Sequence, residues 1–224
     1  MLKKRQITIS GHPGAGKSST GKKIAEFLRY KFFSAGDFRR MAATELGLDI
    51  DTLNMLETFK LEMQNKGLNK CVTSSRLLEE AGLRSEYHDS FQKLMAYGDT
   101  DILVDNQQKN LASTTEEIII EGRLAYLHFP NAFKVFFYCE PTIAASRVFK
   151  DKRNTEKGHS SEEDVLTRIK DSMESDRQRY IAKYGKIGDC YTYEKANFNL
   201  YIDTSHMEQQ EVIDKILKEY SYEW

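Results

Sequence analysis

The chain has 224 residues, 40% of them hydrophobic and 30% charged, and its formal net charge at neutral pH is −1. This composition is typical of a globular protein and argues against an intrinsically disordered one. The small net charge implies no general attraction to nucleic acids or membranes, so a phosphate site must use locally placed basic residues. The length suits one α/β domain with insertions.

The three cysteines are an odd number without the spacing of a metal site, so they are expected to be free thiols in a reducing compartment. The basic N-terminus has no apolar segment behind it. No apolar stretch approaches the roughly 20 residues that a membrane-spanning helix needs. We therefore expect a cytoplasmic protein that binds neither nucleic acid nor membrane.

The N-terminal part predicts a strand, a tight loop and a helix. A β-rich run at 6–10 is followed at once by glycines, and 17–30 has apolar residues at helical spacing. The pair Phe32–Phe33 indicates a second strand, and a helix after it is expected to end near Gly47.

The C-terminal half alternates between strands and helices. Apolar runs predict strands at 117–121, 133–139 and 198–203. Ser-x-x-Glu patterns at 160–163 and 205–208 predict two helix starts, because such a serine caps the first turn. This alternation predicts a parallel sheet with helices on both faces. By contrast, 49–113 has helical periodicity without a convincing strand, which indicates a helical subdomain.

Residues 11–18 match the phosphate-binding loop pattern G-x-x-x-x-G-K-[ST]. Glycines let backbone N–H groups surround a phosphate, and the positive end of the following helix points to the same place. Lys17 can reach the β- and γ-phosphate oxygens, and the Ser18 hydroxyl can bind Mg²⁺. The chain is therefore expected to use ATP and Mg²⁺. The expected ATP-binding residues are Gly11, Pro13, Gly14, Ala15, Gly16, Lys17, Ser18 and Ser19.

His12 occupies a variable position of this loop, and we expect it to be exposed to solvent. GTPase switches are a different class that also uses the loop, but they need an N-K-x-D element for guanine. Neither Asn-Lys pair of this chain is followed by that aspartate, and no D-x-x-G occurs. The sequence therefore favours a phosphotransferase.

From about residue 7 to 57, and again from 99 to 220, the chain resembles the cytidylate kinases, especially their archaeal-type branch. The Glu-Gly-Arg-Leu-Ala and Arg-x-Arg-Tyr segments are more diagnostic than the loop, and an adenylate kinase would show a D-G-F-P-R-like segment in place of the first. The matching segments beyond the loop are Ser34–Asp37 with Arg40, Asp101 with Asp105, Glu121–Ala125, Asp176–Tyr180 and Tyr201–Ser205.

The resemblance implies one P-loop kinase domain over 1–224 with a doubly wound, five-stranded parallel sheet. It further implies a helical acceptor-binding subdomain at about 37–113, with an insertion near 58–98, and a mobile lid at about 147–179. The implied activity is ATP-dependent phosphorylation of a nucleoside monophosphate, foremost CMP or dCMP. The implied partner is this small nucleotide, and the protein is expected to be a monomer or homodimer.

Arg40 and Arg123 each follow a predicted strand. Because the carboxyl ends of parallel strands face one ligand crevice, both are expected to bind the acceptor phosphate. The alternative is two surface arginines on loops. Arg39 matches the family pattern less well and is given no role.

Three basic residues, Arg147, Lys152 and Arg153, precede a polar stretch that suits a lid. For Lys152 and Arg153, a solvated helix end is the alternative. Asp176 and Arg179 match the family's pair near the acceptor, and an exposed i,i+3 ion pair is the alternative.

Cytosine presents an amino donor, so a carboxylate suits its recognition, and Asp101 with Asp105 lie one helical turn apart. Both could instead be solvated acids. Glu121 is expected to order the Mg²⁺ hydration shell or to anchor the loop. The predicted catalytic residues are Lys17, Arg123, Arg147, Arg177 and Arg179, the substrate-binding residues are Ser34, Gly36, Arg40, Asp101, Asp105, Arg123, Asp176 and Arg179, and the metal ligands are Ser18 and Glu121.

Two departures from the family pattern leave the acceptor open. Ser172 stands where the family usually has an arginine, for which Arg168 is a candidate substitute, and the insertion lies in the acceptor-binding subdomain. Two alternatives therefore stay open. The first is a kinase for another nucleotide or for a metabolite hydroxyl, with Asp37 as base. The second is a catalytically silent ATP-binding regulatory protein.

Overall fold

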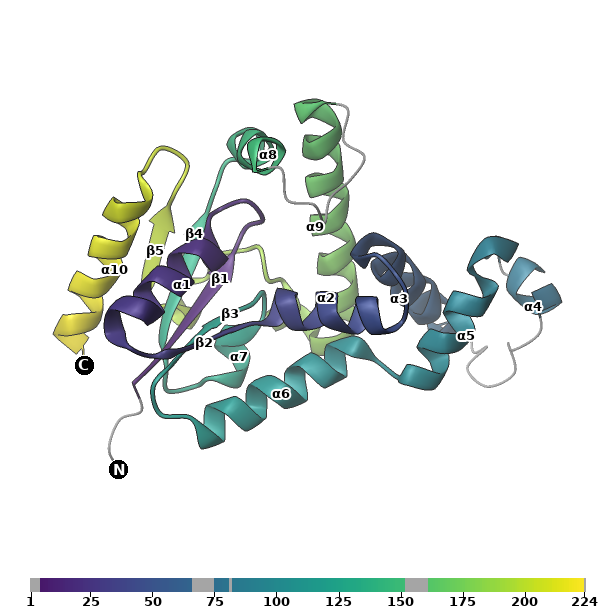
Figure 1. The fold of residues 1–224 in the computed structure, drawn as a ribbon, viewed down its shortest axis with the longest axis horizontal. Coiled ribbons are helices and arrows are strands. Elements are labelled where there is room, and N and C mark those ends of the chain that lie inside the picture. Colours follow the sequence, from purple (N-terminus) through teal and green to yellow (C-terminus); the bar gives the residue numbers. More distant parts are fainter. Residues whose placement is uncertain (1–4, 66–74, 81, 152–160, 224) are drawn as a thin grey trace. The chain divides into compact units, whose positions relative to one another are not determined.

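The computed structural model describes residues 5–65, 75–80, 82–151 and 161–223. The chain forms two compact units, one comprising 1–36 and 107–224 and the other 37–106 (Figure 1). We call them the sheet unit and the helical unit and describe each by itself. No helix among the described residues is long and apolar enough to span a bilayer.

The sheet unit is built on one parallel sheet of five strands. Their order is β2-β3-β1-β4-β5: the chain runs from β1 to the edge strand β2, returns to β3 beside β1, and then crosses to β4 and β5, which places a topological switch beside β1. The predicted five-stranded parallel sheet is confirmed, with strand bounds within a few residues of those expected. The strands are β1 (Gln6–Gly11), β2 (Lys31–Ser34), β3 (Ile118–Glu121), β4 (Phe133–Tyr138) and β5 (Leu200–Asp203).

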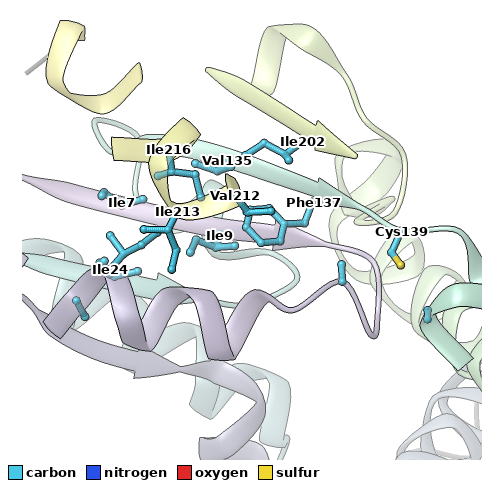
Figure 2. Close-up of a cluster of buried hydrophobic side chains, with 14 of the residues drawn as sticks. Ile7, Ile9, Ile24, Val135, Phe137, Cys139, Ile202, Val212, Ile213 and Ile216 are labelled. Atoms are coloured by element: carbon cyan, nitrogen blue, oxygen red, sulfur yellow. The ribbon is translucent and has the colours of Figure 1, made fainter. Parts of the chain in front are cut away.

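One face of the sheet packs against α1 (Lys17–Leu28) and α10 (Gln209–Glu223), as Figure 2 shows. Alternate residues of the strands point to this face, because successive side chains of a strand lie on opposite sides. The resulting cluster excludes water and fixes β1 against α1, the two elements that flank the glycine-rich loop. Its fully buried members include Ile7, Ile9, Ile24, Val135, Phe137, Ile202 and Ile216.

The opposite face packs against α7 (Ala125–His128), the C-terminal half of α9 (Glu162–Tyr184) and the segment 190–198. Aromatic rings dominate this side, and the ring centroids of Phe136 and Phe198 lie 5.1 Å apart in an edge-to-face arrangement. The remaining elements of this unit are α8 (Pro141–Lys150) and the 3₁₀ turns η2 (Gly185–Gly188) and η3 (Lys195–Asn197).

Of the two predicted helix starts, the structure has a helix start near the first but not at the second. Ser161 caps α9, and its hydroxyl accepts a hydrogen bond from the Asp164 N–H at 3.1 Å. Ser160, the serine expected in this role, lies outside the described residues. The start predicted at Ser205 is wrong, because α10 begins at Gln209 and the Ser205 hydroxyl instead donates to Asp203 Oδ1 at 2.6 Å.

The helical unit contains no strand in its described part. Its core packs leucines and phenylalanines from three helices, among them Leu53, Leu56, Phe91 and Leu94, each at most 3% exposed. The helices are α2 (Ala35–Glu45), α3 (Ile50–Asn65), α4 (Ser75–Glu80), η1 (Ser85–Tyr87), α5 (His88–Tyr97) and α6 (Thr100–Thr114), of which α2 and α6 extend into the sheet unit.

Gly11 closes β1 where only glycine fits. Its φ is +120°, and a Cβ atom there would lie 2.0 Å from the Phe137 carbonyl oxygen of the neighbouring strand. We expect Gly11→Ala to lower the free energy of unfolding by about 3 kcal/mol or more, because backbone strain and a backbone clash act together. Urea unfolding measures the loss. Gly185→Ala is the matched control, since its φ is +70° but its surroundings are open. It should cost about 1–2 kcal/mol, and equal losses for the two variants would contradict the argument.

Candidate active site

The glycine-rich loop connects β1 to α1 at the switch point of the sheet. Gly16 caps α1 with a left-handed φ of 81°, and the His12 N–H donates to the Phe137 carbonyl at 2.9 Å. Gly14 lies so close to α8 that an added Cβ would be 2.8 Å from the Ala144 Cβ. The loop is therefore held against β4 and α8, with the first N–H groups of α1 unpaired within the helix and suited to an anion.

Lys17 folds back over this loop. Its Nζ donates to the His12 carbonyl at 2.5 Å. Burial lowers the pKa of Lys17, the carboxylate of Glu121 opposes that shift, and the positive charge of Arg123 adds to it. The segments that carry the two cationic residues are joined by a hydrogen bond, because Ser18, next to Lys17, donates to Glu121, two residues before Arg123.

Glu121 ends β3 and accepts two hydroxyl groups on one oxygen. Ser18 donates to Glu121 Oε2 at 3.1 Å, and Ser34, at the end of β2, donates to the same oxygen at 2.7 Å. The Ser18 hydroxyl and the Glu121 carboxylate are the hard oxygen donors that Mg²⁺ prefers, and their proximity fits one ion that takes both. Ser34, expected at the substrate, has its hydroxyl directed to Glu121.

A buried carboxylate joins two arginines beside this loop. Asp176, on α9, is 1% exposed, and its Oδ2 and Oδ1 lie 2.9 Å from Arg123 Nη2 and 2.8 Å from Arg179 Nη2. The alternative of an exposed Asp176–Arg179 pair is therefore wrong. Burial works to lower the pKa of Arg123, but Asp176 raises it well above its ordinary value. The group of Arg123, Asp176 and Arg179, which we call the arginine cluster, keeps one net positive charge.

Tyr191 also contacts the arginine cluster, although the sequence analysis assigned it no role. Its hydroxyl donates to Asp176 Oδ2 at 2.7 Å. Burial raises the pKa of Tyr191 well above its ordinary range, and Asp176 acts in the same direction. The phenol therefore stays protonated and serves as a hydrogen-bond donor.

The expectation that His12 is exposed is wrong. The side chain is 9% exposed, and its Nδ1 and Nε2 each lie 3.1 Å from a backbone carbonyl oxygen, that of Cys139 and that of Tyr191. A neutral imidazole has one N–H and donates to one of these carbonyls, whereas an imidazolium donates to both. The physical reason for burial is the ring packing around His12, with the Tyr138 ring centroid at 4.8 Å.

The other predicted arginines of the sheet unit lie apart from the arginine cluster. Arg147 Nη2 donates to the carbonyls of Thr204 at 2.7 Å and Ser205 at 3.1 Å, so it fixes the segment after β5. The Thr204 hydroxyl in turn donates to the Ala15 carbonyl at 3.2 Å, which connects that segment to the loop. Arg177 is half exposed, and its Nε donates to Asp189 Oδ2 at 3.1 Å. Lys152 and Arg153 lie outside the described residues.

The family model for cytidylate kinase matches residues 7–222. The chain belongs to the cytidylate kinase family. The cytidylate kinase of Archaeoglobus fulgidus is 26% identical over 214 residues, which cover 95% of this chain and 93% of that protein. The cytidylate kinase of Thermoplasma volcanium is 27% identical over 218 residues, covering 95% and 89%.

A solved structure supports the fold. The shikimate kinase of Acinetobacter baumannii, in complex with shikimate, matches with a TM-score of 0.50 and 15% sequence identity, over 96% of this chain and 91% of that one. At this identity the likeness concerns the P-loop kinase fold alone. Membership of the cytidylate kinase family identifies this chain as a nucleoside monophosphate kinase.

The helical unit of this kinase contains a second buried ion-pair network, which the sequence analysis missed. Arg39 is 5% exposed and pairs with Glu57 and with Asp101 Oδ1, the latter at 2.7 Å. Glu57 also accepts a hydrogen bond from the Thr100 N–H at 3.2 Å. Asp101 and Asp105 are 6% and 7% exposed, so the alternative that they are solvated acids is wrong.

Arg40, the neighbour of Arg39, has a different environment. It pairs with Asp37 on the surface of α2, and its side chain is 40% exposed. The two adjacent arginines thus allow a matched comparison between a buried and an exposed ion pair.

We expect Arg39→Met to destabilise the kinase by about 3–5 kcal/mol, because two buried carboxylates would lose their counter-charge. Arg40→Met should cost at most about 0.5 kcal/mol, since its pair is exposed to solvent. Urea unfolding of both variants measures the difference. A cost of Arg39→Met as small as that of Arg40→Met would show that the buried network does not hold the helical unit together.

Burial is the largest influence on His12 and lowers its pKa. The two carbonyl contacts oppose this shift, Lys17 adds to it and Asp203 opposes it. In the unfolded chain His12 takes up a proton near pH 6.5, whereas in the folded protein it takes one up only at lower pH. The free energy of unfolding therefore falls as the pH drops below about 6.5. We expect the melting temperature of the wild type to fall more between pH 7.5 and 5.5 than that of His12→Asn. Parallel pH dependence would contradict this assignment.

Proposed function

We propose that this kinase transfers the γ-phosphoryl group of ATP to the phosphate of CMP or dCMP and releases the nucleoside diphosphate. The observation that carries the proposal is that one unit holds a cationic group on the phosphate-binding loop, Lys17, and a second in the arginine cluster, Arg123, on segments joined by the Ser18–Glu121 hydrogen bond. A phosphoryl transfer between two nucleotides requires two phosphate-binding groups of this kind, one for the donor and one for the acceptor.

On the donor side, the N–H groups of residues 14–18 are proposed to surround the β-phosphate of ATP while Lys17 Nζ leaves the His12 carbonyl for the β- and γ-oxygens. Ser18 and Glu121 would hold Mg²⁺, which neutralises charge on these oxygens when bound. Ser34 orients Glu121 for this task through its hydrogen bond. Arg147 is proposed to act from the last turn of α8, where it fixes the segment that contacts Ala15.

On the acceptor side, Arg123 and Arg179 are proposed to bind the phosphate that attacks. The side chain of Arg123 is 31% exposed although it pairs with Asp176, so part of its guanidinium group is available to a ligand. The acceptor phosphate is already an anion at neutral pH, with a second pKa near ~6, so the attack needs no general base. Catalysis then consists of positioning and charge neutralisation.

Base recognition is proposed for the helical unit. Asp101 is held by Arg39, and a fixed buried carboxylate suits the amino group of cytosine, whereas uracil offers an acceptor at that position. Asp105 lies one turn further along α6 and is proposed to share base recognition with Asp101. Arg40 and Gly36 are proposed to bind the same nucleotide because they match the family pattern. Arg177 is proposed to reach the γ-phosphate only when the lid closes.

Free buried thiols support action in a reducing compartment, which we propose to be the cytoplasm. Cys139 and Cys190 are both unpaired and at most 2% exposed, and burial raises the pKa of Cys190 to about 12.

A coupled assay with ATP–Mg²⁺ against CMP, dCMP, UMP, AMP and shikimate tests the proposal. We expect the highest kcat/KM for CMP or dCMP. Lys17→Ala should lower kcat by about 10³-fold or more, because the charge that meets the γ-phosphate is lost, while the melting temperature is retained. Lys23→Ala is the matched control, since Lys23 lies exposed on the same helix. Preference for UMP, AMP or shikimate, or near-normal turnover by Lys17→Ala, would overturn the proposal.

A further inference from the structure

A continuous path of contacts leads from the phosphate-binding loop to the arginine cluster. It begins at Lys17, whose Nζ donates to the His12 carbonyl. The His12 ring then meets the carbonyls of Cys139, at the end of β4, and of Tyr191, each at 3.1 Å. The Tyr191 hydroxyl finally donates to Asp176 at 2.7 Å, and Asp176 binds both arginines.

Both rings of this path are held in place. His12 and Tyr191 are each 9% exposed, and their ring centroids lie 6.1 Å apart at an interplanar angle of 82°. Phe136 and Tyr138 contact the His12 ring from β4, with centroid distances of 5.9 Å and 4.8 Å. An imidazole enclosed in this way cannot turn away from the two carbonyls without displacing aromatic side chains of the core.

An apolar side chain of similar size would fill this space, but it would leave a buried carbonyl oxygen without a donor and would set no direction between the segments. What the polar pair adds is a defined direction and distance between three backbone segments: the loop at His12, the end of β4 at Cys139, and the segment after η2 at Tyr191.

From these contacts we infer that His12 and Tyr191 are positioning residues, which set the separation between the phosphate-binding loop and the arginine cluster. The inference rests on the proposed function in one respect, namely that the cluster binds the acceptor phosphate. In-line transfer requires the attacking oxygen at about 3–3.5 Å from the γ-phosphorus, and a displacement of about 1 Å lowers the rate by about 10²-fold. Neither residue needs to contact a substrate to control that distance.

Tyr191→Phe is the most selective test, because it removes one hydroxyl and keeps the ring. We expect kcat with CMP to fall roughly tenfold, since Asp176 and its arginines gain freedom, while KM for ATP stays within about twofold because the loop is untouched. Tyr193→Phe is the matched control. Its ring packs against Phe136 and Tyr201, but its hydroxyl makes no hydrogen bond to any described residue. It should leave every constant within about twofold.

Two further variants, His12→Ala and the double variant His12→Ala/Tyr191→Phe, complete a double-mutant cycle. If both residues act on one path, the loss of kcat in the double variant will be smaller than the product of the two single losses. The inference would be overturned if the loss of kcat in the double variant equalled the product of the two single losses. It would also be overturned if Tyr191→Phe had the same kcat as Tyr193→Phe.

The same four proteins are compared by thermal unfolding, which separates this inference from the proposed function. If the wild type phosphorylates neither CMP nor dCMP, the proposed function fails, but the link between His12 and Tyr191 is still measured. A loss of melting temperature in the double variant that is smaller than the sum of the single losses supports the link. An additive loss refutes it.

Discussion

The carboxylate of Asp176 is the group on which the rest of the site depends. It is buried, and it accepts two guanidinium groups and one phenol, so every cation of the arginine cluster takes its position from one side chain. Buried ion pairs add little to stability, because desolvation offsets their attraction. The arrangement is better explained by the charge that remains after pairing. The cluster keeps one net positive charge, partly accessible on Arg123, which the phosphate of the proposed acceptor would neutralise.

The topology of the sheet positions the part of the candidate site that contains the phosphate-binding loop and Glu121. Gly11, Ser34 and Glu121 are the last residues of β1, β2 and β3, three neighbouring parallel strands, and Ser34 pairs with Glu121 in the sheet register. Because parallel strands end at the same edge, the loop, the Glu121 carboxylate proposed for Mg²⁺ and the Ser34 hydroxyl that binds it meet there without long side chains. The buried apolar residues of the same strands hold this edge in place. Each strand therefore contributes both core residues and, at its C-terminal end, a residue of the candidate site.

Most of the fold followed from local sequence, whereas the connections within the site did not. Apolar runs predicted all five strands, and the glycine pattern with its strand and helix predicted the phosphate-binding loop. His12 was missed because its partners lie 127 and 179 residues away and are backbone carbonyls, which leave no trace in a sequence. Tyr191 and Arg39 have carboxylate partners nearer in the chain, 15 residues away for Tyr191 and 18 and 62 for Arg39, but these contacts join different elements, so no helical or strand spacing indicates them. At Ser205 a local capping pattern failed because the hydroxyl oxygen accepts a hydrogen bond from the Glu140 N–H, 65 residues away, and not from a following helix.

The two units also differ in the kind of charge that they bury, and this difference bears on the acceptor. In the helical unit, one guanidinium group, that of Arg39, lies between the carboxylates of Glu57 and Asp101. In the sheet unit, one carboxylate lies between two guanidinium groups. The first arrangement has carboxylate oxygens in excess and suits a hydrogen-bond donor, and the second suits an anion. The proposed acceptor, CMP or dCMP, carries both kinds of group, an anionic phosphate and an amino hydrogen-bond donor on its base.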